Sequence, residues 1–423
     1  MKKSLLYISY YFPPIKSIAV KRNYFLAMGL RKYFEEVQIL TTTNHKLVDQ
    51  EKVSLDGLNI VDLPTFDYRT ILAKFKKGKS IHFSESYKKS WFIPFLIKLN
   101  ETFPVNLFFG EGGLRYIYHG FKYGKKYLSS KDEKYIFTSY RPFANVFIGY
   151  MLKKKFKDAV WIINFHDFPI DGIRSNVLLP GLQRWIWEKM LNYTNHNLTV
   201  SKGLEKHIGG LTSKVTTVMN GVVVRKSNIA INKKFKLVYT GSLYHNLGNP
   251  DIFFHSISLM INSGTILESN VEIIYAGKDS ISWMQKIQLY GLTNIAVDMG
   301  EVNTKVAQSL QDAAHINLLI TWATIDQSGV ITGKFYEYLG STNPILTIIN
   351  GCMDYEIFDI FQALNCGKVI ATNDPEAMNE IISFITEKYQ AWKNKTSFPS
   401  YASRLKALNW ENQIKELANI ICH

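Results

Sequence analysis

Short apolar runs alternate along the chain with longer segments whose apolar residues recur at helical spacing. In the first half, runs typical of buried strands lie at residues 5–9, 37–41, 59–63, 135–138, 160–164, 197–200 and 215–219. Segments that favour helices lie between them at 21–33, 143–154, 178–193 and 202–208. Strands that alternate with helices in this way predict a parallel sheet with helices packed on its faces.

The second half repeats the pattern. Strands are predicted at 236–240, 271–276, 295–299, 316–320, 345–349 and 368–371, and helices at 251–261, 281–290 and 305–312. Because 423 residues exceed what one core usually holds, we predict an α/β protein with two doubly wound, Rossmann-like domains. Such domains bind ligands at the carboxyl ends of their strands, so we expect them to face a central cleft. The turn at Asn220-Gly221 suggests domains at 1–222 and 223–405, with a C-terminal helix at 406–423.

Charge changes this picture because it is concentrated in the first half. Residues 1–220 contain 34 Lys and Arg against 17 Asp and Glu, a net charge of +17, whereas the remainder has 16 against 18. A basic surface suits anionic lipid headgroups or nucleic acid. No nucleic-acid-binding motif is visible, so we expect an anionic membrane surface as the partner, with solvated charge that has no partner as the alternative.

The segment at residues 70–127 interrupts the strand–helix rhythm. A cluster of Lys74, Lys76, Lys77 and Lys79 precedes an aromatic stretch at 88–97 and a basic, Tyr-rich helix at 116–127. Lysines flanking Trp and Phe on short amphipathic stretches are typical of proteins that lie on a membrane without crossing it. The alternative is that these aromatic residues fill the core of the first domain.

The sequence shows no sign of a membrane span, a signal peptide or a disulfide framework, and this bears on the cellular compartment. No apolar run reaches the length of about 18 residues needed to span a membrane. The N-terminus has a short apolar part and no cleavage-site pattern, so we interpret it as a first strand and not as a signal peptide. Cys352, Cys366 and Cys422 form neither a disulfide framework nor a metal pattern, which fits a reducing cytoplasm.

Candidate chemistry is densest at residues 328–349. Gly329 and Gly333 permit a tight loop, and the start of the helix that follows presents free N–H groups and partial positive charge to an anion. Lys334 lies in its first turn, and Glu337 follows three residues later on the same side. A cation for phosphate and a carboxylate for sugar hydroxyls suit a nucleoside diphosphate. The alternative is a routine helix start with a surface Lys–Glu pair.

With these residues in view, the chain resembles retaining nucleotide-sugar glycosyltransferases of the GT-B fold, in the large bacterial group that builds surface polysaccharides such as capsule or O-antigen. The resemblance is spread over nearly the whole length. It rests on residues 8–14 with Lys21-Arg22, and on 138–142, 165–167, 198–201, 218–221, 239–242, 276–277 and 333–344. Each match is weak alone, and their order and spacing together carry the resemblance.

The resemblance implies a division of labour between the domains. The C-terminal domain would bind the donor through Gly241, Ser242, His245, Gly277, the backbone of Gly329, Val330, Ile331, Thr332 and Gly333, and the side chains of Lys334 and Glu337. The N-terminal domain would face the acceptor and the phosphates with Pro14, Lys21 and Arg22. His166 and Asp167 would act at the reacting sugar, with Lys334 at the leaving diphosphate. The last helix would pack back on the first domain.

Two departures from the family pattern concern the donor. The family's Glu-x7-Glu motif would place its first Glu at Gly329, so that carboxylate is absent or supplied elsewhere, for example by Asp326. The loop at 243–248 also lacks the Arg and Lys that often hold the diphosphate, which leaves Lys334, His245 or the Lys21-Arg22 pair for this task. We expect no metal, because no His, Cys and Asp cluster has ligand spacing, and a helix start with a lysine can replace one.

Alternatives remain for several of these assignments. His166 and Asp167 could be an ordinary strand-end pair, and Lys21 and Arg22 a solvated helix start. For the whole protein, we expect a transferase on the inner face of the cell membrane that uses a nucleotide sugar and an undecaprenyl-diphosphate-linked glycan acceptor, with no cofactor. The alternatives are a GT-B nucleotide-sugar epimerase or hydrolase, and a catalytically silent sugar-nucleotide-binding protein.

Overall fold

The computed structural model describes residues 3–48, 50–51, 53–75, 92–172, 175–226, 233–243, 247–325 and 327–422. The chain divides into two compact units, residues 1–219 with 413–423 (unit 1) and residues 220–412 (unit 2). Unit 2 begins slightly before the predicted boundary at 222, because the Val222 N–H donates to the Leu408 carbonyl at 2.7 Å within that unit. Of the C-terminal helix, residues from Gln413 onward belong to unit 1.

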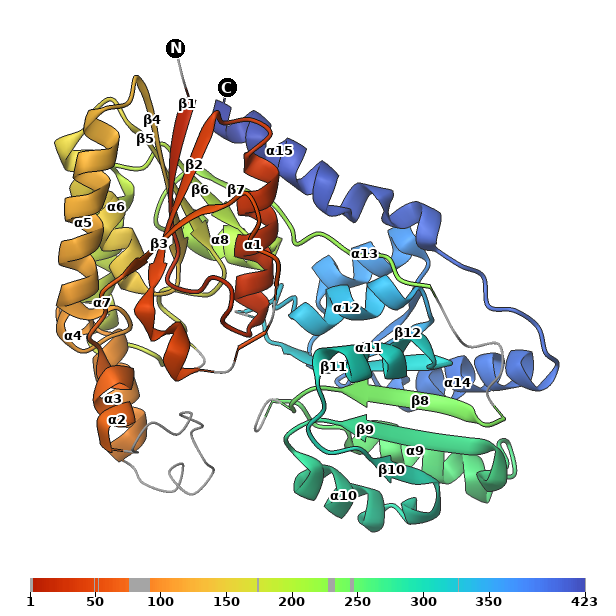
Figure 1. Ribbon diagram of the computed structural model, residues 1–423. Coiled ribbons are helices and arrows are strands. Elements are labelled where there is room, and N and C mark those ends of the chain that lie inside the picture. Colours follow the sequence, from red (N-terminus) through yellow and green to blue (C-terminus); the bar gives the residue numbers. More distant parts are fainter. Residues whose placement is uncertain are drawn as a thin grey trace. The chain divides into compact units, whose positions relative to one another are not determined.

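Unit 1 contains a seven-stranded sheet in the order β3-β2-β1-β4-β5-β6-β7, and its strand pairs are parallel (Figure 1). The strands are β1 (Lys3–Ile8), β2 (Glu36–Thr42), β3 (Asn59–Leu63), β4 (Glu133–Tyr140), β5 (Val160–Phe165), β6 (His196–Thr199) and β7 (Val215–Thr217). The helices are α1 (Ile18–Leu30), η1 (Thr43–Leu47), α2 (Tyr68–Phe75), α3 (Phe92–Glu101), α4 (Val105–Phe108), α5 (Gly113–Ser129), α6 (Phe143–Lys155), α7 (Pro180–Leu191), α8 (Lys202–Gly209) and α15 (Trp410–Cys422).

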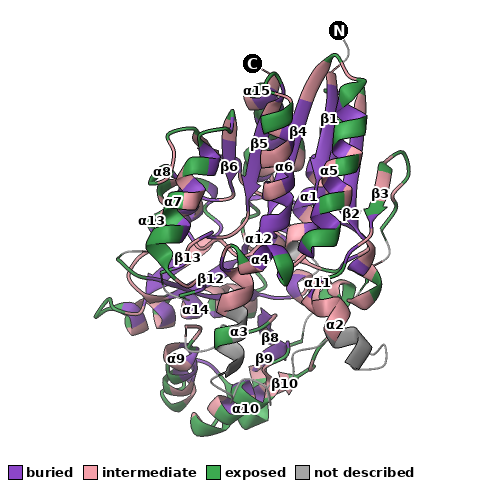
Figure 2. Cartoon of the chain, turned by 90° about the vertical axis from the view of Figure 1, so that its left-hand side faces the viewer, coloured by how far each residue is buried: buried purple, intermediate pink, exposed green. Residues whose placement is uncertain are grey.

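Helices cover both faces of this sheet, with α5 and α6 on one face and α1 on the other (Figure 1). The central strands are buried, whereas the helices expose their outer sides (Figure 2). Within unit 1, α15 packs closely on α1 at Gly29, where an added Cβ would lie 2.2 Å from Ile414 Cδ1. The helices α2 to α5 form an insertion between β3 and β4, which is where the strand–helix rhythm of the sequence breaks.

Unit 2 contains a six-stranded parallel sheet in the order β10-β9-β8-β11-β12-β13. The strands are β8 (Phe235–Thr240), β9 (Val271–Ala276), β10 (Ala296–Asp298), β11 (Ile316–Ala323), β12 (Ile345–Gly351) and β13 (Gly367–Ala371). The helices are α9 (Asp251–Asn262), η3 (Glu268–Asn270), α10 (Ser280–Leu289), η4 (Thr293–Ile295), α11 (Thr304–Asp312), α12 (Gly333–Ser341), α13 (Tyr355–Leu364), α14 (Ala377–Lys393) and η5 (Ala402–Leu408). Its main core packs α9, α10 and α14 against the sheet through residues such as Phe254, Trp283 and Ile381.

The predicted fold class is confirmed. Each strand that the apolar runs predict is present, with ends that differ by at most a few residues. These runs are continuous and apolar because a parallel sheet with helices on both faces buries both sides of every strand. Both sheets therefore present the carboxyl ends of their strands, which is where the candidate residues lie.

Candidate active site

The helix start predicted to bind an anion lies in unit 2, where a loop leads into α12. Thr332 is its N-cap residue in an extended conformation, and the Thr332 side chain makes no capping hydrogen bond. Within the described part of the chain, the N–H groups of Val330, Thr332 and Gly333 have no hydrogen-bond acceptor. These three donors and the positive end of the helix together suit a negatively charged ligand.

Two other N–H groups of this loop were expected to face the diphosphate, and in this structure both donate to other groups of the protein. The Gly329 N–H donates to Asp354 Oδ2 at 2.6 Å, and the Ile331 N–H donates to the Gly329 carbonyl at 3.0 Å. Asp354 is buried and also caps α13, so its carboxylate fixes the start of the loop. Of the predicted backbone donors, the N–H groups of Val330, Thr332 and Gly333 therefore remain available to bind an anion.

Gly329 occupies the position of the missing first Glu of the family motif. Its φ of 73° lies in the left-handed region, where a residue with a side chain is strained. This loop therefore follows a path that suits glycine and does not simply lack a carboxylate. Asp326, the suggested substitute, and His245, a predicted phosphate contact, both lie outside the described residues.

Lys334 reaches from the first turn of α12 to the loop that follows β8. Its Nζ donates to the Tyr239 hydroxyl at 2.7 Å and to the Ser242 carbonyl at 2.5 Å. The same ammonium lies 4.5 Å from the centre of the Tyr239 ring, a cation–π distance. The structure thus brings together Lys334, Gly241 and Ser242, which sequence analysis assigned to one site.

Burial lowers the pKa of Lys334 to about 7, although the nearby carboxylates of Asp279 and Glu337 oppose the shift. Removing the ammonium from water penalises its charged form, and the two carboxylates offset only part of this penalty. Near neutral pH the unliganded lysine is therefore poised between its neutral and charged states. A diphosphate bound beside it would favour the charged state and draw a proton onto the amine.

Gly241 allows Lys334 to take this path. Its φ is 109°, and a Cβ added there would lie 2.5 Å from Lys334 Cε. Gly277 plays a matching role, since its added Cβ would lie 2.2 Å from the Gly241 carbonyl oxygen. Both glycines are thus required by close packing at the strand ends, which is a different role from direct ligand contact.

We expect Gly241→Ala to destabilise unit 2 by about 1–3 kcal/mol, because a strained backbone and a side-chain collision act together. Gly264→Ala is the matched control: its φ is 73°, and an added Cβ there meets nothing within 4 Å. The denaturant midpoints of the two variants would be compared. Equal losses would show that the Cβ does not disturb Lys334.

Glu337 lies one turn after Lys334, and its helix is held in place by an arginine. Arg225 donates to the Glu337 carbonyl at 3.0 Å, to Asp312 Oδ1 at 2.9 Å and to Gln311 Oε1 at 2.8 Å. Arg225 thereby ties α12 to the end of α11. Sequence analysis missed this residue, because nothing near position 225 in the sequence signals a partner more than 80 positions away.

In unit 1, His166 follows β5 and its Nε2 is surrounded by polar groups. Asn164 Oδ1 accepts from Arg22 Nε at 3.3 Å and from Arg22 Nη2 at 3.1 Å, so the amide nitrogen of Asn164 faces His166 Nε2, at 3.2 Å. Ser139 Oγ lies 2.5 Å from the same Nε2. The arginine therefore fixes the amide orientation, and donation from this amide requires a lone pair on Nε2 and the proton on Nδ1, whereas the Ser139 hydroxyl, which also donates to Asn23 Oδ1 at 2.9 Å, does not decide the tautomer.

His166 is neutral. Burial and, to a smaller extent, the positive charge of Arg22 together lower its pKa to about 3. No described residue makes a hydrogen bond to Nδ1. An uncharged imidazole with its proton on Nδ1 can donate a hydrogen bond to a ligand oxygen, but it cannot act as an acid near neutral pH.

Arg22 is placed differently from its predicted role at phosphate. It is 2 % exposed and donates to the carbonyls of Val218 and Met219 as well as to Asn164. These contacts tie α1 to the segment that follows β7, so they describe a structural and positioning role. Lys21 stays half-buried in the first turn of α1, and the Pro14 carbonyl accepts from the Glu51 N–H at 2.8 Å. The phosphate and acceptor roles of these residues remain predictions.

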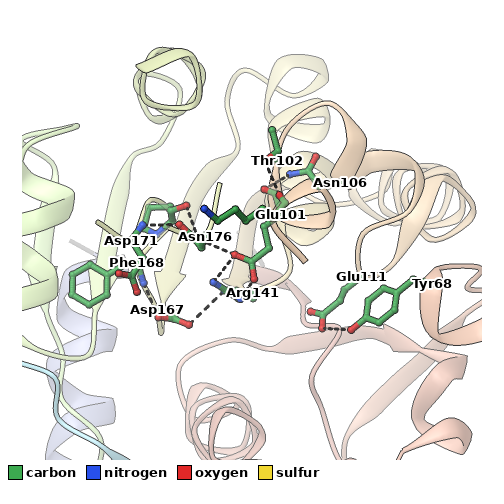
Figure 3. A network of polar contacts seen from close by, with 12 residues as sticks. Tyr68, Glu101, Thr102, Asn106, Glu111, Arg141, Asp167, Phe168, Asp171 and Asn176 are labelled. Atoms are coloured by element: carbon green, nitrogen blue, oxygen red, sulfur yellow. Dashed lines mark hydrogen bonds and ion pairs between the residues drawn. The ribbon is translucent and has the colours of Figure 1, made fainter. Parts of the chain in front are cut away.

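Asp167 belongs to a second polar cluster at the same sheet edge (Figure 3). Arg141, which follows β4, binds both carboxylate oxygens of Glu101 at 2.6 and 3.0 Å, and its Nε lies 3.5 Å from Asp167 Oδ2. Asn176 Nδ2 donates to Glu101 Oε2 at 2.8 Å. The end of α3 is thereby fixed at the edge where His166 and Asp167 lie. The Arg141-Pro142 motif was noticed in the sequence, but Glu101 was not.

A third cluster anchors the start of the insertion. Arg69 donates to Glu111 Oε1 and to the Tyr11 hydroxyl, and its guanidinium lies 5.4 Å from the Tyr11 ring and 5.5 Å from the Tyr68 ring. Figure 3 shows Glu111 and Tyr68 together near the Arg141 cluster. The start of the insertion and the end of α3 are thus both attached at the carboxyl edge of the sheet. Lys76, Lys77 and Lys79 lie outside the described residues.

Two kinds of feature are absent from the described residues. They contain no group of three or more His, Cys, Asp and Glu side chains that could hold a metal ion. Among their helices, none combines the length and apolarity needed to cross a membrane.

Comparisons with known proteins connect this arrangement to a fold. No protein-family model and no curated protein matches the sequence. The chain is similar in structure to a sucrose-phosphate synthase from Thermosynechococcus elongatus, with a TM-score of 0.63 and 11% identity over 99% of this chain and 98% of that one. It is also similar to the lipopolysaccharide outer core galactosyltransferase WaaB, with a TM-score of 0.59 and 11% identity over 99% of both chains.

The fold is that of the GT-B glycosyltransferases. TarM of S. aureus, in a complex that includes UDP, matches with a TM-score of 0.59 and 11% identity over all of both chains. A putative UDP-N-acetylglucosamine 2-epimerase from Listeria monocytogenes matches with a TM-score of 0.51 and 10% identity over 99% of this chain and 95% of that one. At these identities the comparison establishes the GT-B fold, and the chemistry must be argued from the residues.

Proposed function

We propose that this protein is a metal-independent glycosyltransferase that moves a sugar from a nucleotide-diphosphate sugar to a lipid-linked glycan, with retention of anomeric configuration. The observation that carries the proposal is the start of α12, where Lys334 lies in the first turn and the N–H groups of Val330, Thr332 and Gly333 have no acceptor among the described residues. In a fold shared with nucleotide-sugar transferases, these groups suit the diphosphate of a donor.

The chemistry assigned to unit 2 is stabilisation of the leaving group. As the sugar–phosphate bond breaks, negative charge grows on the diphosphate and positive charge on the sugar. The N–H groups of Val330, Thr332 and Gly333 and the dipole of α12 are fixed before the reaction and do not have to reorganise. Lys334 adds a full charge when protonated, and a nucleotide bound beside it raises the protonated fraction.

The chemistry assigned to unit 1 is positioning. His166 is neutral and carries its proton on Nδ1, so it would orient an oxygen of the reacting sugar by donating a hydrogen bond. Asp167, fixed by Arg141, would accept from a hydroxyl at the same edge. Retention of configuration and a place in surface-polysaccharide biosynthesis rest on the resemblance of the sequence motifs. WaaB, which acts on the lipopolysaccharide outer core, supports the second point.

The acceptor and location follow from charge and from the same resemblance. The excess of cations in the first half suits an anionic surface, and an undecaprenyl-diphosphate-linked glycan would present its sugar there. We therefore place the protein on the inner face of the cell membrane as a peripheral protein.

We expect that neutralising Lys74, Lys76, Lys77 and Lys79 together weakens binding to anionic vesicles by about 1 kcal/mol per charge near the surface. Lys74 is the one lysine of this cluster within the described residues.

The test is a thermal-shift panel of nucleoside diphosphates and nucleotide sugars, followed by product analysis with the ligand that binds. A ligand that binds only the folded state raises the melting temperature by mass action, so the panel identifies base and sugar together. Transfer that requires an acceptor supports the proposal. Acceptor-independent epimerisation or hydrolysis would favour the alternative suggested by the epimerase match. Binding without turnover would favour the silent binding protein, to which Gly329 in place of a carboxylate points.

Glu337→Ala is expected to weaken binding of the cognate nucleotide by about 1.5–3 kcal/mol, because hydrogen bonds to a carboxylate are worth that much. Titration calorimetry with the nucleoside diphosphate would measure the change. Glu301→Ala is a suitable control, because Glu301 is an exposed carboxylate of the same unit. Unchanged affinity of the Glu337 variant would remove this residue from the donor site.

A further inference from the structure

Helix α7 has two apolar faces, and the fold uses only one of them. Gln183, Trp187, Met190 and Leu191 point inward and are buried. On the outer side, Leu182 is 47% exposed and Trp185 is 56% exposed. Leu179, which precedes the helix, is 68% exposed and has a φ of 50°. A leucine in the left-handed region costs about 1–2 kcal/mol, so its exposure there is paired with local strain.

Two more exposed apolar side chains lie on the insertion, after a turn that is hydrogen-bonded to α7. The Phe103 N–H donates to Gln183 Oε1 at 3.0 Å, and Gln183 Nε2 donates to the Phe103 carbonyl at 3.1 Å, which joins α7 to the turn before α4. Phe108 is 51% exposed and Phe109 is 54% exposed at the end of α4. Exposed aromatic and aliphatic side chains thus lie on α7 and at the end of α4, and the turn before α4 is hydrogen-bonded to α7.

Lys and Arg outnumber acids both on α7 and on α5, the helix that follows α4. α5 and α7 together contain six Lys and Arg residues and one Glu. The exposed cations are Arg115, Lys122, Lys125 and Lys126 on α5 and Arg184 and Lys189 on α7. The single acid, Glu188, is paired with Arg184 at 3.0 Å. On α7 itself Arg184 and Lys189 outnumber Glu188, so an apolar occupant with negative charge at its surface complements this face.

We propose that the outer face of α7, formed by Leu179, Leu182 and Trp185 and continued by Phe108 and Phe109, docks onto an anionic lipid bilayer. The apolar side chains enter the boundary between headgroups and acyl chains, while Arg184 and Lys189 meet the headgroup phosphates. Trp beside Lys is the pairing that membrane interfaces favour: Lys189 Nζ lies 6.0 Å from the Trp185 ring.

This inference rests on the proposed function, and it indicates from which side a lipid-linked acceptor would approach unit 1. The turn after α3 that holds Thr102 is hydrogen-bonded to the Leu178 N–H at 2.8 Å, and Glu101 beside it binds Arg141 at the edge that carries Asp167. A lipid-linked sugar held at the bilayer would therefore approach unit 1 next to this edge. A purely electrostatic partner such as a soluble polyanion would not require the exposed leucines and tryptophan.

The test compares vesicle binding of two variants with the same number of apolar residues removed from each surface. In the first, Leu182 and Trp185 are both replaced by Ser. In the control, Ile281→Ser is combined with Leu289→Ser, which removes two side chains of α10 in unit 2 that are each 75% exposed. Co-sedimentation would use vesicles of phosphatidylcholine with and without phosphatidylglycerol. We expect the first variant to lose roughly tenfold or more in partitioning onto the anionic vesicles, and the control to bind as the wild type does.

A second measurement reports how deeply Trp185 enters the bilayer. Brominated lipids are expected to quench the tryptophan fluorescence of the wild type, and Trp185→Phe to remove most of that quenching. Equal partitioning of the two double variants, or quenching unaffected by Trp185→Phe, would overturn the proposal. So would a wild-type protein that self-associates through this face and ignores vesicles. Because the variants at Leu182 and Trp185 leave unit 2 unchanged, their nucleotide binding separates this failure from failure of the proposed function.

Discussion

Lys334→Ala is expected to lower kcat by about 10²–10³-fold while weakening donor binding much less. The reason is that charge on the diphosphate grows as the bond breaks, so a preorganised cation stabilises the transition state more than the bound donor. Single-turnover rates and donor affinities would be measured separately. Lys305→Ala is the matched control, because Lys305 is an exposed lysine on α11 of the same unit.

The same lysine predicts a pH dependence of donor affinity. Because burial lowers the pKa of Lys334 to about 7, the free protein loses this charge as pH rises through neutrality. Both phosphates of a nucleotide sugar are esterified and stay ionised throughout, so binding above pH 7 must first protonate the amine. Affinity is therefore expected to be constant below about pH 7 and to fall above it until the pKa of the complex is reached, by a total factor no larger than the modest loss of donor affinity expected for Lys334→Ala.

Two results would contradict this role. A Lys334→Ala variant that changes affinity and leaves single-turnover rates unchanged would make the lysine a simple binding residue. A wild-type affinity that does not change between pH 6 and pH 9 would show that its charge does not respond to the diphosphate. In either case the loop N–H groups would have to carry the leaving-group stabilisation alone.

The apolar pattern of the sequence was sufficient to predict the strands and the fold, because this pattern depends on burial alone. Strands such as β1, β5 and β11 are apolar on both faces, and this follows directly from helices covering both sides of each sheet. The start of α12 was also predictable, since glycines followed by a lysine at a helix start are a local pattern. The position of Lys334 against Tyr239 and Ser242 was not, because it joins residues more than 90 positions apart.

The contacts that the sequence did not predict also join residues that are far apart in the chain. Arg22 resembled a solvated or phosphate-binding arginine in the sequence, yet its guanidinium binds carbonyl groups nearly 200 positions away. Glu101 and Arg141 form a bidentate pair that closes the insertion onto the sheet, and nothing near Glu101 in the sequence indicates it. Trp185 was assigned only to a helix, because the period of apolar residues does not distinguish an inward face from a second, outward one.

His166→Ala is expected to lower turnover by about 10²-fold while leaving nucleotide affinity nearly unchanged. The nucleotide contacts are assigned to unit 2, whereas His166 lies in unit 1 and would position an oxygen of the reacting sugar. Because burial and Arg22 lower the pKa of His166 to about 3, the imidazole is neutral at every pH at which the enzyme would be assayed. Its removal should therefore lower the rate without changing the shape of the pH profile, whose alkaline limb belongs to Lys334.

Three variants make this test specific. His166→Gln keeps a side-chain N–H donor and should recover part of the lost rate, whereas His119→Ala, on α5 of the same unit, should behave as the wild type. Asn164→Asp replaces the amide that donates to Nε2 by a carboxylate that can only accept, so it should move the imidazole proton to Nε2. Nitrogen chemical shifts of the histidine ring would report that change directly. If turnover of His166→Ala equalled that of the wild type, or if its pH profile lost an acidic limb, the assignment of a neutral, hydrogen-bond-donating imidazole to the acceptor side would be wrong.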